Sequence, residues 1–265
     1  AAEPPGGPVP ALEIRRVPAF LDNYLWLVHA PETGETAVVD PGDAHAIDTA
    51  LREAGWSLTH ILVTHHHLDH VGGVSALKAR WGAVVVGPRR DAERIPSLDE
   101  PVGDGDTVSL GGHTAQVFDV PGHTRGHIAY WFTDDAAAFV GDTLFAAGCG
   151  RMFEGTPEQF WSSLGALRRL PDETRVYCAH EYTESNLRFA CSVFPDHAAL
   201  AARAASVQAA RARGEATVPS TMAEERATNP FLWSDDPAVA THLGLAADAP
   251  PSAVFAELRG RKDRF

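Results

Sequence analysis

The stretch Thr64-His-His-His-Leu-Asp-His-Val-Gly-Gly73 holds four histidines and one aspartate within ten residues. It directly follows the apolar run Ile61-Leu62-Val63, which predicts a strand that ends where the histidines begin. Neutral imidazoles and a carboxylate are typical ligands of zinc, iron or manganese. A solvated loop or an incidental histidine run would not place Leu68 and Asp69 here, directly after an apolar strand. The stretch therefore predicts a metal site at the end of a buried strand.

The orientation of these side chains follows from the expected backbone. In an extended segment, successive side chains point to opposite sides of the chain. We therefore expect His65, His67 and Asp69 to face one side, and His66 and Leu68 to face the other. Two glycines at positions 72 and 73 would let the chain turn tightly into the next helix.

Three further candidates follow strand-like runs, where loops usually carry function. They are His123 in Pro121-Gly-His-Thr-Arg-Gly-His127, Asp142 in Phe139-Val-Gly-Asp-Thr143, and His180 in Tyr177-Cys-Ala-His-Glu-Tyr182. Each alone is a weak signal, because single histidines and Gly-Asp-Thr turns are common in loops. With the first stretch they supply five histidines and two aspartates, enough for two metal ions and an open position. The histidines that we interpret as structural or supporting are His60, His66 and His113.

Short β-rich runs alternate with helical patterns up to about residue 182, which predicts stacked layers of sheet and helix. Strands are expected at residues 23–29, 36–40, 58–63, 83–86, 114–120, 128–133, 136–140 and 175–179, and helices at 44–54, 74–80 and 157–170. The composition then changes, since residues 198–212 contain nine alanines and no β-branched run. We therefore expect a catalytic domain at residues 11–182 and a mostly helical domain at residues 183–265.

Composition excludes several classes of protein. The 265 residues, 45% of them hydrophobic, are enough for one large core or for a large and a small one. Lys and Arg number 22 against 35 Asp and Glu, and the net charge of −13 would repel nucleic acid and anionic lipid. No apolar run approaches the roughly 18 residues of a membrane-spanning helix. We expect neither nucleic acid nor a membrane as a partner.

The cysteines and the N-terminal residues bear on the compartment. Three cysteines without CxxC spacing form neither a disulfide framework nor a cysteine zinc site, which indicates a reducing, cytoplasmic setting. Residues 1–10 lack a positively charged start and an apolar stretch, so we expect no secretory signal. Cys149 and Cys178 lie near candidate ligands in the sequence, and we interpret them as small buried residues rather than nucleophiles.

These motifs resemble the metallo-β-lactamase superfamily, whose His-x-His-x-Asp-His run, downstream His, Asp and final His occur here in the same order. Within it the chain is similar to the glyoxalase II family, through the Ala-Gly-Cys-Gly run at residues 147–150 and the basic C-terminus. The segments that carry the resemblance are residues 18–24, 64–73, 141–150, 179–183, 229–231 and 261–265. The resemblance implies an α+β fold, a four-layer αββα sandwich, followed by a small helical domain that helps to hold glutathione.

The resemblance also implies a metal centre and a reaction. The first ion would be held by His65, His67 and His123, the second by Asp69, His70 and His180, and Asp142 would bridge them. The ions would be zinc, with iron or manganese as alternatives. The reaction would be hydrolysis of S-D-lactoylglutathione and other S-2-hydroxyacylglutathiones to glutathione and a 2-hydroxy acid, as in methylglyoxal detoxification. Asp69 would also orient the attacking hydroxide.

Five residues match the family's glutathione contacts by position: Arg151, Phe153, Tyr182, Arg259 and Lys262. Phe153 takes a position that is often Tyr, so one hydroxyl contact would be absent. Trp233 stands where a basic residue is frequent. Charge supports the match independently, because a glutathione thioester carries two carboxylates. Residues 259–264 contain four basic residues and one acidic residue, the densest positive window of this acidic chain.

Two other functions stay open on the sequence. A persulfide dioxygenase of the same superfamily would bind a single iron, act on a glutathione-derived substrate and consume oxygen. A non-catalytic metal-binding module is the other, although structural zinc sites are closed by four ligands on one ion. Lactonase or β-lactamase activity gives no reason for the basic C-terminus, and nuclease activity conflicts with the charge of −13. We expect a monomer.

Overall fold

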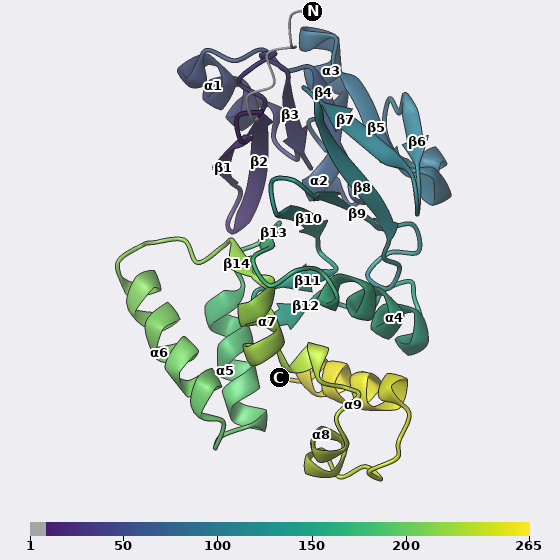
Figure 1. Ribbon diagram of the computed structural model, residues 1–265, viewed down its shortest axis with the longest axis vertical. Coiled ribbons are helices and arrows are strands. Elements are labelled where there is room, and N and C mark those ends of the chain that lie inside the picture. Colours follow the sequence, from purple (N-terminus) through teal and green to yellow (C-terminus); the bar gives the residue numbers. More distant parts are fainter. Residues whose placement is uncertain (1–8) are drawn as a thin grey trace, which may run out of the picture.

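The computed structural model describes residues 9–265 and contains two six-stranded sheets with helices outside them (Figure 1). The helices that follow residue 182 gather at one end of the sheets. Within residues 9–265, no helix is both long and apolar enough to cross a membrane. Residues 1–8, most of the segment for which we expected no secretory signal, lie outside the described part of the chain.

The first sheet has the strand order β1-β2-β3-β4-β5-β6. Its strands are β1 (Glu13–Ala19), β2 (Asn23–His29), β3 (Thr36–Val39), β4 (His60–Leu62), β5 (Val84–Pro88) and β6 (Glu100–Val102). Strands β1 to β3 pair antiparallel, whereas β3 to β6 pair parallel. Because β3 and β4 are parallel neighbours, the loops after them leave the sheet at the same edge.

The second sheet has the order β14-β13-β10-β9-β8-β7. Its strands are β7 (Thr107–Leu110), β8 (His113–Asp119), β9 (Ile128–Phe132), β10 (Ala137–Gly141), β13 (Arg175–Cys178) and β14 (Ser220–Thr221). Strands β10 and β13 are parallel, so the loops after them also leave together. A small hairpin, β11 (Leu144–Phe145) and β12 (Gly148–Cys149), follows β10.

Helices lie outside the two sheets and at one end of them. They are α1 (Ala44–Ala54), α2 (Leu68–Val71), α3 (Val74–Trp81), α4 (Pro157–Arg168), α5 (Thr183–Val193), α6 (Ala198–Ala212), α7 (Met222–Thr228), α8 (Pro237–His242) and α9 (Pro251–Asp263), with 3₁₀ turns η1 (Arg89–Arg94) and η2 (Pro230–Leu232). Their ends follow the sequence. Asp43 caps the first turn of α1, Gly55 ends that helix in the left-handed conformation, and Thr156 and Gln159 form a capping box at α4.

The alternation of side chains along β2 shows how the layers pack. Leu25 and Leu27 face α1 and α3, where they meet Ile47 in one apolar cluster. Trp26 faces the second sheet and packs edge-on against Tyr177, with the ring centroids 4.8 Å apart. Both faces of β2 are therefore covered, and all seven of its residues are buried. With α4 packed on the second sheet, this is the expected four-layer αββα fold.

Most predicted elements are present, with ends shifted by one or two residues. Six strands were missed by the sequence analysis: five have two to four residues, too short to show a period, and the sixth is the seven-residue edge strand β1. One expectation is wrong. Leu68 and Asp69 are not extended but form the first turn of α2, so strict alternation of side chains ends at His67.

Candidate metal centre

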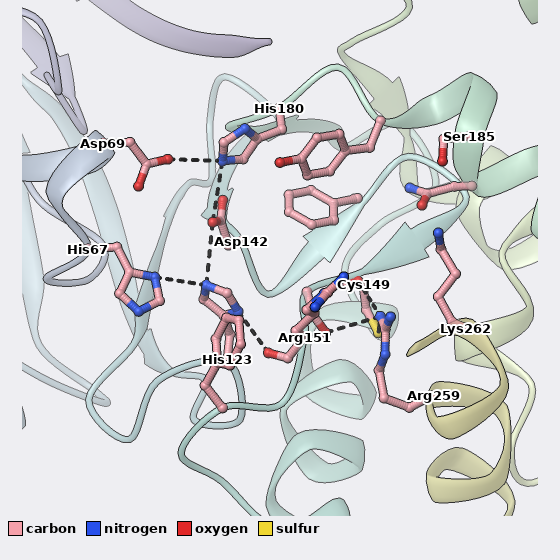
Figure 2. Close-up of a pocket in the computed structure, with 15 residues that line it drawn as sticks. His67, Asp69, His123, Asp142, Cys149, Arg151, His180, Ser185, Arg259 and Lys262 are labelled. Atoms are coloured by element: carbon pink, nitrogen blue, oxygen red, sulfur yellow. Dashed lines mark hydrogen bonds and ion pairs between the residues drawn. The ribbon is translucent and has the colours of Figure 1, made fainter. Parts of the chain in front are cut away.

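Loops from both sheets meet at one edge and bring the candidate ligands together. His65 and His67 lie in the loop after β4, and Asp69 and His70 lie in α2, which follows at once. The loop between β8 and β9 carries His123. The loops after β10 and β13 carry Asp142 and His180, respectively. Figure 2 shows five of these side chains, His67, Asp69, His123, Asp142 and His180, converging on one cavity.

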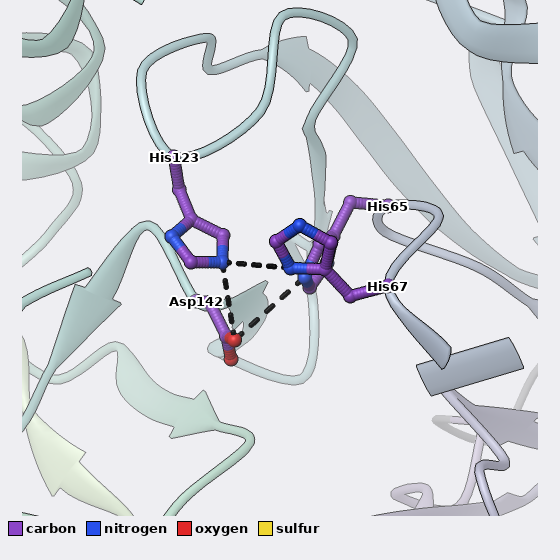
Figure 3. A group of neighbouring side chains, drawn as sticks. All are labelled: His65, His67, His123 and Asp142. Atoms are coloured by element: carbon purple, nitrogen blue, oxygen red, sulfur yellow. Dashed lines mark hydrogen bonds and ion pairs between the residues drawn. The ribbon is translucent and has the colours of Figure 1, made fainter. Parts of the chain in front are cut away.

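The first group consists of His65, His67, His123 and Asp142, whose ligand atoms lie within 4.8 Å of one another (Figure 3). Asp142 Oδ2 is 3.7 Å from His65 Nε2 and 3.4 Å from His123 Nε2. His67 Nδ1 lies 3.1 Å from His123 Nε2. Three imidazole nitrogens and one carboxylate oxygen thus face a common point, which is a donor set suited to a divalent ion.

The second group consists of Asp69, His70 and His180, which meet the same criterion. Asp69 Oδ2 is 3.2 Å from His70 Nε2 and 3.3 Å from His180 Nε2. Asp142 Oδ2 also lies 3.2 Å from His70 Nε2 and 3.4 Å from His180 Nε2. The Asp142 carboxylate therefore lies between the two groups and contacts nitrogens of both.

Buried atoms without partners show that these residues fit metal ions. His65 Nε2, His70 Nε2 and Asp142 Oδ1 are inaccessible to solvent and have no hydrogen-bond partner among the described residues. Buried polar atoms are normally hydrogen-bonded, so a group of unpaired ones at a single point fits a bound metal ion. The donor chemistry, imidazole nitrogen and carboxylate oxygen, suits zinc, iron or manganese.

The protonation of the ligands supports the same interpretation. Burial and the neighbouring His70 hold the pKa of His65 well below its ordinary value, and burial and His123 lower the pKa of His67 to about 4. Burial alone would lower the pKa of His180, but the Asp142 carboxylate raises it to about 10. Burial would raise the pKa of Asp142, yet His70 and His180 hold it well below its usual range. The carboxylate is ionised and attracts whatever cations surround it, protons or metal ions.

Each of four candidate ligands has a second partner that fixes its ring. His70 Nδ1 donates to Asp40 Oδ2 at 2.9 Å, and His180 Nδ1 donates to Asp22 Oδ1 at 2.8 Å. His123 Nδ1 donates to the Arg151 carbonyl at 2.8 Å, and His65 Nδ1 lies 2.9 Å from Thr64 Oγ1. Such partners orient the imidazoles of metal sites and strengthen them as ligands.

The sequence analysis did not identify these partners. Asp40 also accepts hydrogen bonds from the backbone and hydroxyl of Thr64, at 2.7 and 2.6 Å, so it braces the start of the histidine loop. The available signal was its position directly after the buried strand β3, where parallel strands end together. Asp22, between β1 and β2, gave no signal, because only tertiary structure brings it to His180.

The cavity beside the ligands has a volume of about 430 Å³ and a basic far wall. His67, Asp69, His123, Asp142 and His180 line one end, as Figure 2 shows. All five residues predicted to contact glutathione also line it: Arg151, Phe153, Tyr182, Arg259 and Lys262. The structure therefore brings ligands and predicted substrate contacts into one space.

The three cations of this wall differ in how they are held. Arg259 is buried, donating to the Cys149 carbonyl at 2.8 Å and to Asp263 at 2.9 Å. Arg151 and Lys262 make no hydrogen bond or ion pair through their side chains within residues 9–265. Burial and the charge of Arg259 lower the pKa of Lys262. Arg151 and Lys262 are thus the charges free to meet an anionic ligand.

The aromatic residues of the cavity lie beside the ligands. The Tyr182 ring stacks on His180, with ring centroids 4.7 Å apart and planes at 3°. Burial raises the pKa of the Tyr182 hydroxyl, so it stays protonated and can donate. Phe153 is exposed and packs against His123, with ring centroids 5.3 Å apart. Trp233 is not in this cavity, because its indole N–H donates to the Arg226 carbonyl in the helical part.

Two cysteines and two histidines that we interpreted as structural have surroundings that agree with this interpretation. Burial raises the pKa of Cys149 to about 11 and that of Cys178 to about 12, so both thiols stay protonated. His60 Nδ1 lies 2.7 Å from Thr59 Oγ1, and His113 Nδ1 donates to Asp135 at 2.7 Å. Neither histidine belongs to a ligand group.

An ionic cluster braces the loops around the first ligand group. Arg94 donates to the buried Asp91 at 2.7 Å and to Glu154 at 2.7 Å, and its Nη1 lies 3.1 Å from His66 Nε2. Arg125 donates to Asp91 at 3.1 Å. This cluster connects η1, the histidine loop, the loop that carries His123 and the loop that carries Arg151. His66 thus lies in this cluster, with Asp91 and Glu154, and in neither of the two ligand groups above.

Two protein-family models together match nearly the whole described chain. The model described as metallo-beta-lactamase superfamily matches residues 20–180, and the model described as hydroxyacylglutathione hydrolase C-terminus matches residues 181–265. The first match contains all seven candidate ligands, and the second contains Tyr182, Arg259 and Lys262.

Relatives and solved structures agree with these matches. A curated relative from Maricaulis maris, named hydroxyacylglutathione hydrolase, is 56% identical over 254 residues, 96% of this chain and 99% of that protein. The solved structure of ETHE1 from Myxococcus xanthus has a TM-score of 0.67 and 27% identity, and covers 94% of this chain and 90% of that one. Another protein, solved in a di-iron-bound form, has a TM-score of 0.58 and 26% identity over 82% of this chain and 98% of that chain.

Proposed function

The chain belongs to the hydroxyacylglutathione hydrolase, or glyoxalase II, family of the metallo-β-lactamase superfamily, and we propose that it hydrolyses S-D-lactoylglutathione to glutathione and D-lactate. Other S-2-hydroxyacylglutathiones would react in the same way. The observation that carries this proposal is the basic cavity, which joins the ligand groups to Arg151 and Lys262 in one space. A thioester placed at the ligands would leave its glutathione carboxylates near those two charges.

We propose that two divalent ions bind at the centre, zinc first, with iron or manganese as alternatives. His65, His67 and His123 would hold one, Asp69, His70 and His180 the other, and Asp142 both. Such a pair, when bound, lowers the pKa of water enough to supply hydroxide at neutral pH and polarises the carbonyl under attack. The orphaned nitrogens of His65 and His70 support this assignment.

The chain's own residues position the reactants. Asp69 holds its Oδ2 against His70, His180 and Asn23, which leaves its Oδ1 to accept a hydrogen bond from the attacking water. The Tyr182 hydroxyl, held protonated above the cavity floor, can donate to the glutathione moiety. Arg151 and Lys262 hold its carboxylates, and Arg259 donates to the backbone carbonyl of Cys149, another residue of the cavity lining.

The leaving group explains why no strong general acid is needed. A thiol has a pKa of about 8.5, so a thiolate departs without prior protonation, unlike the amine of an amide. Burial raises the pKa of the Cys149 and Cys178 thiols, which supports water rather than a cysteine as the nucleophile. The geometry therefore fits direct attack of water on a thioester.

The test is the loss of thioester absorbance from S-D-lactoylglutathione, with metal content measured on the same sample. We expect rapid loss with two ions per chain and no oxygen uptake. A glutathione persulfide dioxygenase would consume oxygen with one iron and leave the thioester intact. A chain that binds metal and hydrolyses nothing would contradict the proposal and favour a metal-binding module.

The setting of the reaction is part of the proposal. We propose a monomer as the active unit. The three cysteines are free, and two of them are buried, as suits a reducing cytoplasm where glutathione is abundant. We propose that residues 11–182 form the catalytic domain and that residues 183–265 form the domain that helps to hold glutathione.

A further inference from the structure

An apolar groove of about 710 Å³ adjoins the basic cavity at the second ligand group. Phe20, Leu21 and Leu68 form its apolar wall. Asp69, His180 and Tyr182 line both the groove and the basic cavity. In Figure 2, Asp69 lies at the far end of the cavity from Lys262. The groove therefore continues the cavity beyond the second ligand group.

The groove collects much of the apolar surface that the molecule exposes. Leu21 is 101% exposed, Leu68 78% and Phe20 61%. They are three of the six large hydrophobic residues exposed within residues 9–265, and the other three lie outside the groove. Single apolar side chains on a surface need no explanation, but a cluster beside a reactive centre indicates a contact surface.

The backbone that carries this wall is strained at Phe20 and closely packed at Gly42. Phe20 has a φ of 53°, in the left-handed region that bulky side chains rarely adopt. A side chain at Gly42 would fall 3.0 Å from the Phe20 ring and 1.8 Å from the Asp69 carbonyl, so the glycine lets the turn before β2 approach α2. Strain of this kind persists where the surroundings enforce it, most often at functional sites.

The direction of the substrate follows from the charges on the two sides. The proposed function places the thioester carbonyl at the ligands and the glutathione carboxylates at Arg151 and Lys262. The acyl group lies on the other side of the carbonyl carbon, so it points away from those cations and towards the groove. No lysine or arginine lines the groove, and its three most exposed side chains are hydrocarbon. It is suited to a neutral apolar chain rather than to a carboxylate.

We propose that this groove is the acyl-group subsite, and that the enzyme favours S-2-hydroxyacylglutathiones with a larger apolar acyl group over the lactoyl compound. The inference rests on the proposed function and adds the substrate class. Full burial of one methylene is worth about a four-fold change in affinity, and an open groove buries only part of each. We therefore expect kcat/KM to rise about two-fold per added methylene over the first few carbons.

The experiment uses the metal-loaded full chain and a series of thioesters. The series contains S-lactoyl-, S-2-hydroxybutanoyl-, S-2-hydroxyhexanoyl- and S-mandeloylglutathione. The variants are Leu21→Ser and Leu68→Ser. Each should flatten the rise with chain length and lower kcat/KM for the mandeloyl compound about five-fold, while changing the lactoyl value less than about two-fold. Val9→Ser, another exposed apolar side chain outside the groove, is the matched control and should leave the series unchanged.

The outcomes separate this inference from the proposed function. A flat series in the unchanged protein, with normal lactoylglutathione turnover, would overturn the acyl subsite and leave the hydrolase intact. An unaltered rise in both leucine variants would also overturn it, because the acyl chain would then be bound outside this groove. Failure of the unchanged protein to hydrolyse lactoylglutathione would instead contradict the proposed function. Leu21 is fully exposed, so its variant should melt at the same temperature as the unchanged chain.

Discussion

The metal centre and the basic cavity beside it differ in how their side chains are held. In the centre, buried imidazoles are fixed on the far side of the ring by partners such as Asp40 and Asp22. In the cavity, the side chains of Arg151 and Lys262 make no hydrogen bond or ion pair within the described residues, and Lys262 Nζ lies over the Phe189 and Phe265 rings, whereas Arg259 is held by hydrogen bonds. Rigid ligands suit a fixed ion, whereas unpaired cations suit a flexible tripeptide that must enter and leave. Under the proposed function, the residues that would hold the metal ions are fixed by hydrogen bonds, whereas two of the cations that would bind the substrate are not.

The largest effect should come from the residue shared by the two ligand groups. Asp142→Asn removes the charge that lies near both groups, so we expect loss of bound metal and a fall in thioester hydrolysis of about 10³-fold or more. Metal analysis and turnover on one preparation check this. Asp235→Asn, at a surface ion pair with Arg168, should change neither. If the Asp142→Asn variant kept two ions and full activity, Asp142 would have no place in the centre.

The partners behind the ligands should have the next largest effect. Asp22→Asn and Asp40→Asn keep the shape of the side chain but weaken its hold on His180 and His70. We expect a loss of about 10–100-fold in metal affinity or activity. Competition with a chelator measures the affinity. If both variants retained the affinity of the unchanged chain, the rings would be held by packing alone, and the contrast with the cavity would fail.

Within the cavity, substitutions of Lys262 and of Arg259 should have different effects on kinetics and on stability. Lys262→Met should raise KM about ten-fold with little change in stability, because it removes one charge-assisted contact to substrate. Arg259→Met should instead lower the free energy of unfolding by about 2 kcal/mol, because it leaves buried carbonyls and Asp263 without a donor. Kinetics and urea unfolding of both variants distinguish the two roles, and Arg213→Met on the surface serves as the control. Equal effects on stability would erase the distinction.

The smallest effect concerns the ionic cluster behind the first ligand group. The hydrogen bond from Arg94 lowers the pKa of Glu154 from 4.5 to about 2. A lowered pKa in the folded state means that the stabilisation is present above about pH 4.5 and is lost as the pH falls towards 2. Glu154→Gln should therefore unfold more easily than the unchanged chain at about pH 6, and the difference should shrink by about pH 3. Urea unfolding at both pH values measures it, and a constant difference would contradict the prediction.

Features set by residues close together in the sequence were predicted better than features set by contacts between distant residues. Strand β2 and helix α1 were found because the residue patterns that favour a strand or a helix are local. Asp69 was placed in an extended segment and lies in α2, because a single helical turn has no period to detect. The candidate ligands were grouped by motif order, whereas Asp22 was missed because it is 158 residues from its partner His180.

The sequence by itself determined the kinds of ligand, their order and the approximate strand ends on which they lie, since strands and the chemistry of histidine and aspartate are local properties. Only the tertiary structure decided which residues meet. It placed Asp142 between two groups of imidazoles, buried Arg259 while leaving Lys262 free, and joined the loop at Leu21 to the helix at Leu68. The physical reason is that parallel pairing of β3 with β4 and of β10 with β13 sends distant loops out of the same edge, where packing of the two sheets against each other fixes every distance.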